Sequence, residues 1–315
     1  MKREDLVRDI RQVLGRTGFF LTDAKLFTNE VFDLAGRRDA TLVVVKCLLN
    51  GYSLTKEAAE QLLKVAHLLQ GTPLVVAAHS THGKLESGVV YLRYRAPLLS
   101  FQTLKDFLVE GVPPLAFAGP GGYFVQVNSV ALRRARQSRR LSLDALAREA
   151  GVSRRAIQLY EEGMSAAVEA AERLERFFGE SITVPINPFT YHIAPEAAEK
   201  GGAEVSDFEA YVFRALEGMG YRVTQAARCP FDAIVEAPPE RILSGIEANA
   251  AHVPARAQSL AALARVAETD VVLFVTRELK RSSIAGTPVV TRRELEQAGD
   301  GSEIMDIIKQ RKKGD

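Results

Sequence analysis

The amino-acid sequence predicts a multidomain α+β protein in which two related α/β domains, each with a mixed sheet, flank a central all-α domain. Helical and strand-like segments alternate near both ends of the 315-residue chain, as they do in α/β domains. Amphipathic helices fill the middle of the chain. In addition, FDLAGRRDATLVVVKCLLN (32–50) aligns without a gap with FDAIVEAPPERILSGIEAN (231–249), which indicates an internal duplication.

Length and composition are those of an ordinary globular protein of two or three domains, with 47% hydrophobic and 25% charged residues. The net charge of +2 excludes a globally basic binder, so any surface for nucleic acid must be a local patch. The N-terminal segment lacks the apolar core of a signal peptide, and the apolar run at 42–49 is too short to cross a bilayer. We therefore expect a cytoplasmic protein without membrane contact.

The first α/β domain is predicted to occupy residues 1–112. Apolar periodicity indicates a helix at 3–16, strands at 19–21, 31–35 and 42–49, a helix from Ser53 to Gln70, strands at 74–78 and 89–94, and a short helix near 103–108. Prolines and glycines between 111 and 122 indicate a turn-rich connection to the next domain.

The last domain is predicted at 203–315, as a repeat of the first. After a proline-containing linker at 181–202, a helix at 204–217 precedes GYRV (220–223), much as the opening helix precedes GFFL (18–21). In both copies the matched segments then lead to a helix and an apolar strand. The basic C-terminal segment, IIKQRKKGD, is predicted to be disordered or frayed.

The central domain, predicted at 123–182, contains two short amphipathic helices joined by a tight turn. Apolar residues recur at helical spacing in the first of them, at Leu143, Leu146, Ala147 and Ala150. Gly151 then suits the positive φ that closes such a turn, and Ser153 is a good N-cap for the second helix. This is the layout of a helix-turn-helix, whose second helix is placed to enter the major groove.

The run GVSRRAIQLYEEG (151–163) resembles the G-V-S-x-x-x-I-x-x-Y-E-x-G signature of Cro/CI-type (XRE family) regulators, and the preceding LRRARQSRRLSLDALAREA is similar to the family's first two helices. The order of parts along the chain also resembles a group of archaeal regulators that carry this domain at mid-chain. The resemblance covers residues 128–180. It implies a sequence-specific DNA-binding transcriptional regulator, with a recognition helix at about Ser153–Glu161 in the major groove.

Arginines dominate the charge of this block, since residues 128–163 contain eight arginines against four acids. The planar guanidinium fits phosphate oxygens or the edge of guanine, although a solvated helix face would also collect arginines. At the start of a helix, however, cations oppose the helix dipole. Arg154 and Arg155 therefore do not stabilise the helix, and binding to DNA explains their presence better. The candidate DNA-binding residues, several of them implied by the resemblance, are Ser153, Arg154, Arg155, Gln158, Leu159, Arg133, Arg136 and Arg140.

Each α/β copy resembles the core of restriction endonucleases and Holliday-junction resolvases. That resemblance implies a D…(D/E)-x-K motif, whose carboxylates bind Mg²⁺ and whose lysine orients an attacking water. Asp33 and Lys46 occupy the first and last positions in the N-terminal copy, but Val44 replaces the middle acid.

The C-terminal copy departs further from the motif, because it keeps Asp232 but has Leu243 and Gly245 in place of the acid and the lysine. Glu247 lies one strand period further along and could in principle substitute for the acid. With one carboxylate per copy, Mg²⁺ would be poorly held. We therefore expect a degenerate nuclease-like fold without catalysis, metal or cofactor, in which Asp33, Lys46 and Asp232 are vestigial. His67, His79 and His82 lack metal-ligand spacing, and loop or packing roles are expected.

The expected partner is double-stranded DNA carrying an inverted repeat, bound by a homodimer. The α/β domains would serve dimerisation or sensing, either between chains or by pairing within one chain. No effector can be named from the residues. Two alternatives stay open at this point: a Mg²⁺-dependent nuclease or resolvase targeted by the helix-turn-helix domain, and a non-catalytic scaffold for protein interactions.

Overall fold

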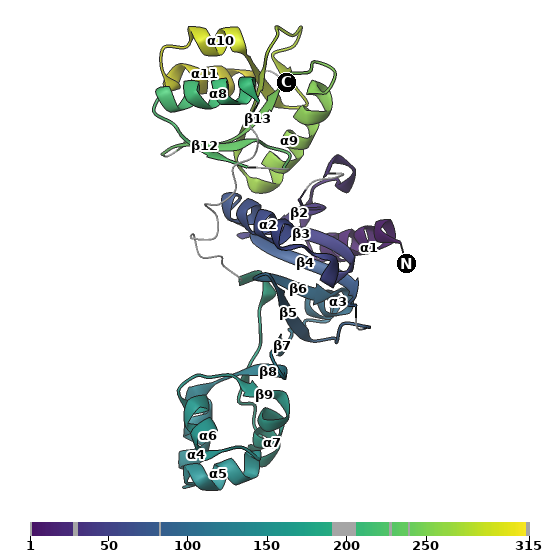
Figure 1. Ribbon diagram of the computed structural model, residues 1–315, viewed down its shortest axis with the longest axis vertical. Coiled ribbons are helices and arrows are strands. Elements are labelled where there is room, and N and C mark those ends of the chain that lie inside the picture. Colours follow the sequence, from purple (N-terminus) through teal and green to yellow (C-terminus); the bar gives the residue numbers. More distant parts are fainter. Residues whose placement is uncertain are drawn as a thin grey trace. The chain divides into compact units, whose positions relative to one another are not determined.

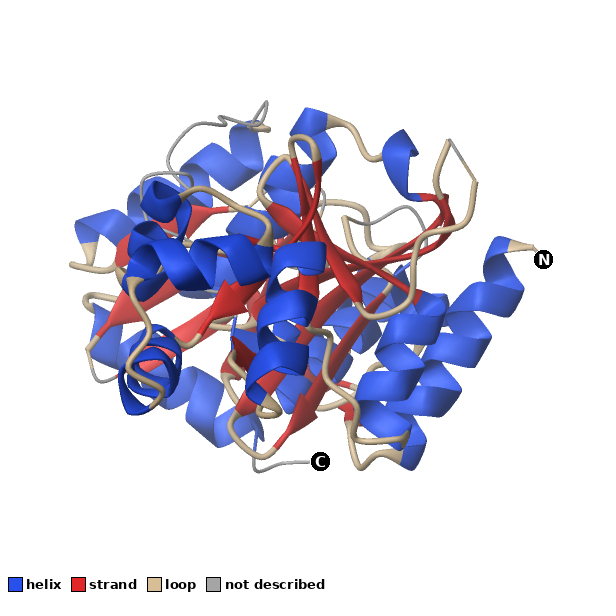
Figure 2. Ribbon diagram, turned by 90° about the horizontal axis from the view of Figure 1, so that it is seen from below, coloured by secondary structure: helices blue, strands red, loops and turns tan. Residues whose placement is uncertain are grey.

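The computed structural model describes residues 2–27, 31–81, 83–190, 206–226, 229–238 and 240–312 of the chain. His82, the second half of the predicted linker at 181–202 and the last three residues lie outside the described residues. The protein is a multidomain α+β chain, as predicted, and contains both helices and strands (Figure 2). It divides into two compact units, each with helices and strands. The first unit comprises residues 1–6, 48–55 and 74–191, and the second comprises 7–47, 56–73 and 192–315. Within the described residues, every helix is too short or too polar to cross a bilayer.

The first unit is built on a mixed sheet in the order β4-β6-β5-β7-β8-β10, with β9 paired to β8. Its strands are β4 (Thr72–His79), β5 (Val89–Arg93), β6 (Ala96–Ser100), β7 (Ala116–Gly119), β8 (Gly122–Val127), β9 (Ala166–Ala167) and β10 (Thr183–Val184). Its helices are α3 (Phe101–Val109), α4 (Ser129–Ser138), α5 (Leu143–Ala150), α6 (Arg154–Glu161) and α7 (Val168–Phe178), with short 3₁₀ turns at Gly51–Ser53 and Pro188–Thr190.

The turn-rich connection predicted between 111 and 122 contains a strand, which corrects the prediction. β7 and β8 form an antiparallel hairpin in which Ala116 faces Val125. Gly121 and Gly122, with φ of +90° and +148°, close its turn in a backbone conformation that glycine adopts without steric cost. The glycines and prolines therefore mark the hairpin turn and its approach, and they conceal the short strand between them.

The second unit contains the N-terminal hairpin, a six-stranded sheet and most of α1. The bounds are α1 (Arg3–Arg16), β1 (Phe20–Leu21), a 3₁₀ turn at Ala24–Phe27, β2 (Leu34–Arg38), β3 (Thr41–Asn50) and α2 (Lys56–Leu68). After the linker come α8 (Asp207–Gly218), β11 (Arg222–Gln225), β12 (Ala233–Ala237), β13 (Glu240–Glu247), α9 (Val253–Ala267), β14 (Asp270–Val275), β15 (Ser283–Ile284), β16 (Thr287–Thr291), α10 (Arg292–Gln297) and α11 (Gly301–Lys312).

Helix α2 begins three residues later than predicted, because the chain first makes a 3₁₀ turn. The side chain of Asn50 accepts a hydrogen bond from the Tyr52 amide, so Asn50, rather than Ser53, acts as the cap at this point. Ser53 instead donates to the carbonyl of Asn50 at 2.7 Å. The helix proper starts at Lys56.

One pattern of strand pairing occurs twice along the chain. β1 pairs antiparallel with β2 and β2 with β3, as β11 does with β12 and β12 with β13. The register is also shared, since Leu34 faces Val45 where Ala233 faces Ser244. β4 is parallel to β6 and β6 antiparallel to β5, as β14 is to β16 and β16 to β15. These pairings agree with an internal duplication, which stays a prediction.

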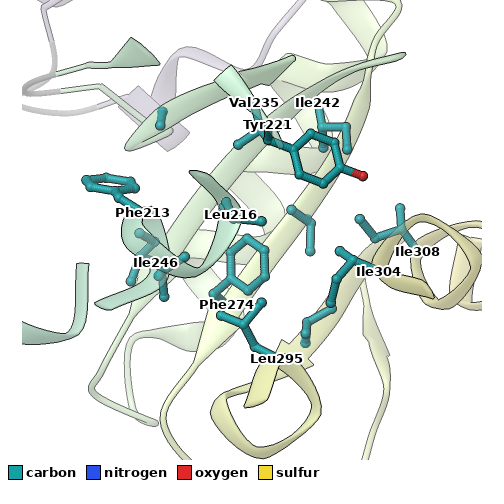
Figure 3. Close-up of a cluster of buried hydrophobic side chains, with 14 of the residues drawn as sticks. Phe213, Leu216, Tyr221, Val235, Ile242, Ile246, Phe274, Leu295, Ile304 and Ile308 are labelled. Carbon is teal, nitrogen blue, oxygen red and sulfur yellow. The ribbon is translucent and has the colours of Figure 1, made fainter. Parts of the chain in front are cut away.

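The six-stranded sheet, in the order β11-β12-β13-β14-β16-β15, has its main core on the face covered by α8, α10 and α11. Figure 3 shows this core, in which Phe274 of β14 lies among side chains from the sheet and from the three helices. Alternate strand residues point to this face because side chains alternate along a strand. Helix α9 packs on β13, β14 and β16.

Residues 307–312 of the basic C-terminal segment form the end of helix α11, which corrects the prediction of a disordered or frayed tail for these residues. The helix buries Ile304, Met305 and Ile308 in the core. Arg311 donates hydrogen bonds to the carbonyl of Val289 and to the carboxylate of Glu294. In this segment, therefore, the apolar residues that accompany the basic ones indicated a packed helix, and this indication outweighed the basic composition.

We expect Arg311→Ala to destabilise this domain in a pH-dependent way. Burial alone would raise the pKa of Glu294, but the Arg311 guanidinium and the amide and hydroxyl of Thr291 lower it from 4.5 to about 2. A lowered carboxylate pKa stabilises the folded state above pH 4.5, and this contribution is lost as the pH falls toward 2. Melting temperatures of the wild type and the variant should therefore differ near neutral pH and converge near pH 2.

The matched control on the same helix is Lys312→Ala, which removes an exposed ion pair between Lys312 and Asp270 of β14. Exposed pairs contribute little, so this variant should melt close to the wild type. Equal losses in the two variants, or a difference that persists at pH 2, would contradict the role given to Arg311.

Candidate nucleic-acid interface

Helices α4 to α7 pack around one small core beside β8 and β9 (Figure 1). The residues that the sequence places on the inner faces of the helix-turn-helix are in this core, and they include Leu146, Ala150, Ile157 and Tyr160. Burial raises the pKa of the Tyr160 hydroxyl. The core therefore fixes α5 and α6 against each other and leaves their polar faces outward.

The turn between α5 and α6 has the geometry that the sequence predicts. Gly151 ends α5 in the left-handed conformation, with φ of +68°. The hydroxyl of Ser153 accepts a hydrogen bond from the Ala156 amide at 3.1 Å and so caps the start of α6. Ser142 caps α5 in the same way. These caps satisfy amides that have no partner within the helix.

The first turn of α6 presents polar groups to solvent. Ser153, Arg154, Arg155 and Gln158 are exposed, and Leu159 is half-buried. Arg154 makes an exposed ion pair with Asp144 at 3.5 Å, and Gln158 donates to Glu162 at 3.0 Å. Among the described residues, the guanidinium of Arg155 has no hydrogen-bond or ion-pair partner. These side chains can exchange their weak contacts for a ligand at little cost.

Arg136, a predicted DNA-binding residue, is held inside the domain by hydrogen bonds. Its Nε and Nη2 atoms donate to the two carboxylate oxygens of Glu161 at 2.6 and 3.0 Å, and Nη1 donates to the carbonyl of Leu141 at 3.0 Å. The side chains of Arg136 and Glu161 are only 16% and 7% exposed. The carboxylate raises the pKa of Arg136. This guanidinium is therefore not free to contact DNA.

The other arginines in α4 and just after it divide between structural and exposed positions. Arg133 donates to the carbonyl of Glu161 at 2.9 Å and keeps about half of its side chain exposed, at 53%. Arg139 donates to the carbonyls of Phe177 and Phe178 at the end of α7. Arg140 is exposed and lies just beyond α4 with a φ of +53°.

The sequence reasoning missed the role of Glu161, and it counted Arg148 among the eight arginines without making it a candidate contact. Glu161 was counted among the acids that offset the arginines, whereas it is the buried partner of Arg136. The Y-E-x-G signature includes this glutamate, but the signature alone does not show which residue the glutamate pairs with. Arg148 of α5 is exposed, and within the described residues its side chain makes no hydrogen bond or ion pair. It adds a cation to the same small domain.

In the N-terminal copy, Asp33 is 5% exposed and supports the strand pair. Its Oδ2 atom accepts a hydrogen bond from the Cys47 amide at 2.6 Å, and its Oδ1 atom lies 4.0 Å from Nζ of Lys46. Val44, at the position of the middle acid, is fully buried. Asp33 and Lys46 are thus brought together, whereas the position of the middle acid holds a buried valine.

The C-terminal copy repeats the anchoring of the aspartate and fills the lysine position. Oδ2 of Asp232 accepts from the Ile246 amide at 2.6 Å, and Arg256 of α9 donates to Oδ1 at 2.6 Å. Burial raises the pKa of Asp232, and Arg256 opposes that rise. A side chain at Gly245 would collide with Leu260 of α9. This copy therefore has no space for a lysine at the motif position.

No cluster of three or more His, Cys, Asp or Glu side chains is placed to hold a metal ion in the described part of the chain. Glu247, which could have replaced the missing acid, accepts a hydrogen bond from the Asn249 amide at 2.8 Å. Asp33 and Asp232 each accept a hydrogen bond from the amide of a neighbouring strand, and each carboxylate faces a cation. Their arrangement supports the strands in both copies.

Comparison with known protein families assigns two parts of the chain. The profile of the PD-(D/E)XK superfamily domain matches residues 3–114. A helix-turn-helix profile matches residues 132–184. The nuclease-like fold and the helix-turn-helix domain expected from the sequence are therefore both present.

Relatives match along nearly the whole chain. Proteins of Methanosarcina mazei and Methanosarcina barkeri are 34% and 33% identical to it, each across 99% of this chain and 98% of the relative. A protein of Halorubrum lacusprofundi is 33% identical over the same shares. All three carry names that provisionally describe HTH-type transcriptional regulatory proteins. No solved structure gives a significant match.

We expect Glu161→Gln to destabilise the helix-turn-helix domain by on the order of 3 kcal/mol, because it leaves the buried charge of Arg136 without its partner. Urea unfolding followed by circular dichroism measures this free energy. Glu162→Gln is the matched control, since Glu162 is exposed and contacts only the side chain of Gln158 among described side chains. A loss below about 1 kcal/mol for Glu161→Gln would show that the ion pair does not fix α4 against α6.

Proposed function

The chain belongs to the family of these archaeal HTH-type transcriptional regulatory proteins, and from that premise we propose that it regulates transcription by sequence-specific binding to duplex DNA through α6. Ser153, Arg154, Arg155 and Gln158 would contact DNA from the first turn of this helix. Leu159 could contact a thymine methyl group. Its place of action would be the cytoplasm.

The observation that carries this proposal is the exposed start of α6. A helix N-terminus favours anions and disfavours cations, yet Arg154 and Arg155 both lie there. Among the described residues, the one ion pair that either of them makes is the exposed pair of Arg154 with Asp144. A nearby phosphate would satisfy both the helix dipole and the guanidinium groups. An arginine that reaches into the major groove can also read guanine by two hydrogen bonds.

We assign a role to each arginine according to how many contacts its guanidinium makes within the domain. Arg133, Arg140 and Arg148 keep exposed guanidinium groups, and we assign them to phosphate contacts that set the register. Arg136, which was a candidate for DNA binding, is assigned to the support of α6 instead. The residues of α6 would then contact the bases.

We further propose that two chains bind an inverted repeat as a homodimer. One chain carries one recognition helix, and a two-fold pair of such helices reads two half-sites about one turn of DNA apart. The domain limits proposed for this assembly are 1–112, 123–182 and 203–315.

Nuclease activity is the second candidate, because the PD-(D/E)XK profile covers residues 3–114. We propose that this domain is not catalytic. Val44 is fully buried where the second carboxylate would stand, and a hard cation such as Mg²⁺ requires several oxygen ligands. Asp33 would then be retained for its hydrogen bond to the next strand.

The test of the proposed interface is the double change Arg154→Ala/Arg155→Ala. Loss of two side chains that contact bases or nearby phosphates should weaken binding to the preferred site by about 10- to 100-fold, since one good base contact contributes about 1–3 kcal/mol. Fluorescence anisotropy at roughly physiological salt measures this affinity on the preferred site and on random duplexes. Arg176→Ala, an exposed arginine on α7, is the control and should bind as the wild type does.

Unchanged DNA retention in the double variant would contradict the proposal. That outcome would favour the scaffold alternative, in which the helix-turn-helix domain contacts another protein. Circular dichroism of the variant confirms that any loss of binding is not a loss of fold.

The nuclease candidate makes a separate prediction. Supercoiled plasmid incubated with the full-length protein and Mg²⁺ or Mn²⁺ should stay intact, because each copy lacks one of the carboxylates that would hold the ion. Cleavage that is abolished by Asp33→Ala would overturn the non-catalytic assignment. Cleavage that survives Asp33→Ala identifies a contaminating nuclease.

A further inference from the structure

The two α/β copies contact each other inside the second unit through arginines that donate to helix ends. Arg37 of β2 donates from Nε to the carbonyl of Val266 at 2.7 Å and from Nη2 to that of Ala267 at 3.1 Å. Both carbonyls belong to the last turn of α9. In the other direction, Arg241 of β13 donates to the carbonyl of Leu68, in the last turn of α2.

The two helix ends are equivalent in the copies. Both helices follow the segments that match in sequence. A residue in the left-handed conformation follows each within two positions of its last residue, Gln70 with φ of +53° after α2 and Glu268 with φ of +54° after α9. Leu68 precedes Gln70 by two positions, as Val266 precedes Glu268. Each copy therefore donates to the same carbonyl of the other copy's helix.

The two arginines also occupy one equivalent place in the strand pairs. Arg37 faces Leu42 across β2 and β3, and Glu236 faces Arg241 across β12 and β13. These two pairs coincide when the copies are aligned. The arginine stands on the first strand in one copy and on the second strand in the other. The exchange of contacts is thus reciprocal, as it is at the interface of a two-fold dimer.

Physical chemistry favours these contacts. The last carbonyls of a helix have no partner within it, and the dipole places partial negative charge there. The Arg37 and Arg241 side chains are only 18% and 25% exposed, and each is also near a carboxylate, that of Glu268 at 3.5 Å and that of Glu236 at 3.1 Å. Each guanidinium therefore lies near a carboxylate and donates to a helix carbonyl, while Nε of Arg241 is buried without a hydrogen bond.

We propose that the two α/β domains form an intramolecular pseudo-dimer, in which Arg37 caps α9 of the C-terminal copy and Arg241 caps α2 of the N-terminal copy. Ser259 of α9 adds a one-sided contact by donating to the carbonyl of Leu26 at 3.1 Å. The helix ends are thereby engaged within one chain. A dimer of two chains on DNA must use a different surface. This inference does not rest on the proposed DNA binding.

The test uses the full-length protein with a protease recognition sequence inserted between residues 197 and 198. After cleavage, size-exclusion chromatography shows whether the two pieces stay together. The wild-type pieces should elute as one species. In Arg37→Ala/Arg241→Ala the dissociation constant of the pieces should rise by about 100-fold, because each substitution removes hydrogen bonds made by a charged donor. Arg222→Ala, an exposed arginine on β11, is the control and should behave as the wild type does.

Separation of the wild-type pieces, or equal retention in the double variant, would overturn the proposal. Hydrogen–deuterium exchange of the uncleaved single variants distinguishes a lost contact from misfolding. Arg37→Ala should increase exchange in the last turn of α9 and leave that of α2 unchanged, and Arg241→Ala should do the reverse. Increases confined to the neighbourhood of each substituted residue would also overturn it.

Discussion

The buried ion pair between Arg136 and Glu161 is the interaction on which the orientation of the recognition helix depends. It joins α4 to the last residue of α6 through two hydrogen bonds from one guanidinium. The same guanidinium holds the carbonyl of Leu141, at the start of the turn into α5. One charged group therefore holds α4, the end of α6 and the loop that leads into α5, and the exposed start of α6 projects from a fixed frame.

Arginine serves two physical purposes in this protein. Some guanidinium groups satisfy carbonyls that a helix leaves unpaired at its end, as Arg139 does at α7 and Arg37 at α9. Others, such as Arg155, stand in solvent. A charge count treats these groups alike, although only the second kind can neutralise a phosphate without breaking an internal contact. The useful cationic surface is therefore smaller than the composition suggests.

Local patterns in the sequence predicted the parts of the structure that local forces determine. Helical spacing, the cap at Ser153 and the positive φ at Gly151 were predictable, because each depends on a few adjacent residues. Strand β7 was missed because the prolines and glycines around it resemble a loop, and the end of α11 was missed because its basic residues resemble a tail. The role of Arg136 was also beyond local reasoning, since its partner lies 25 positions away. In the nuclease-like copies, the absence of the middle acid could be read from the sequence, which has Val44 at that position. That a side chain at position 245 would collide with α9 could be seen only from the packing of this helix.

The central claim is that two chains each read one half of an inverted repeat with α6. Selection of genomic fragments bound by the full-length protein at roughly physiological salt, followed by footprinting of the selected sites, tests this claim most directly. We predict two protected half-sites in inverted orientation, with centres about 10 base pairs, or one helical turn, apart. Equal binding to random and genomic fragments, or protection without a repeated half-site, would contradict it.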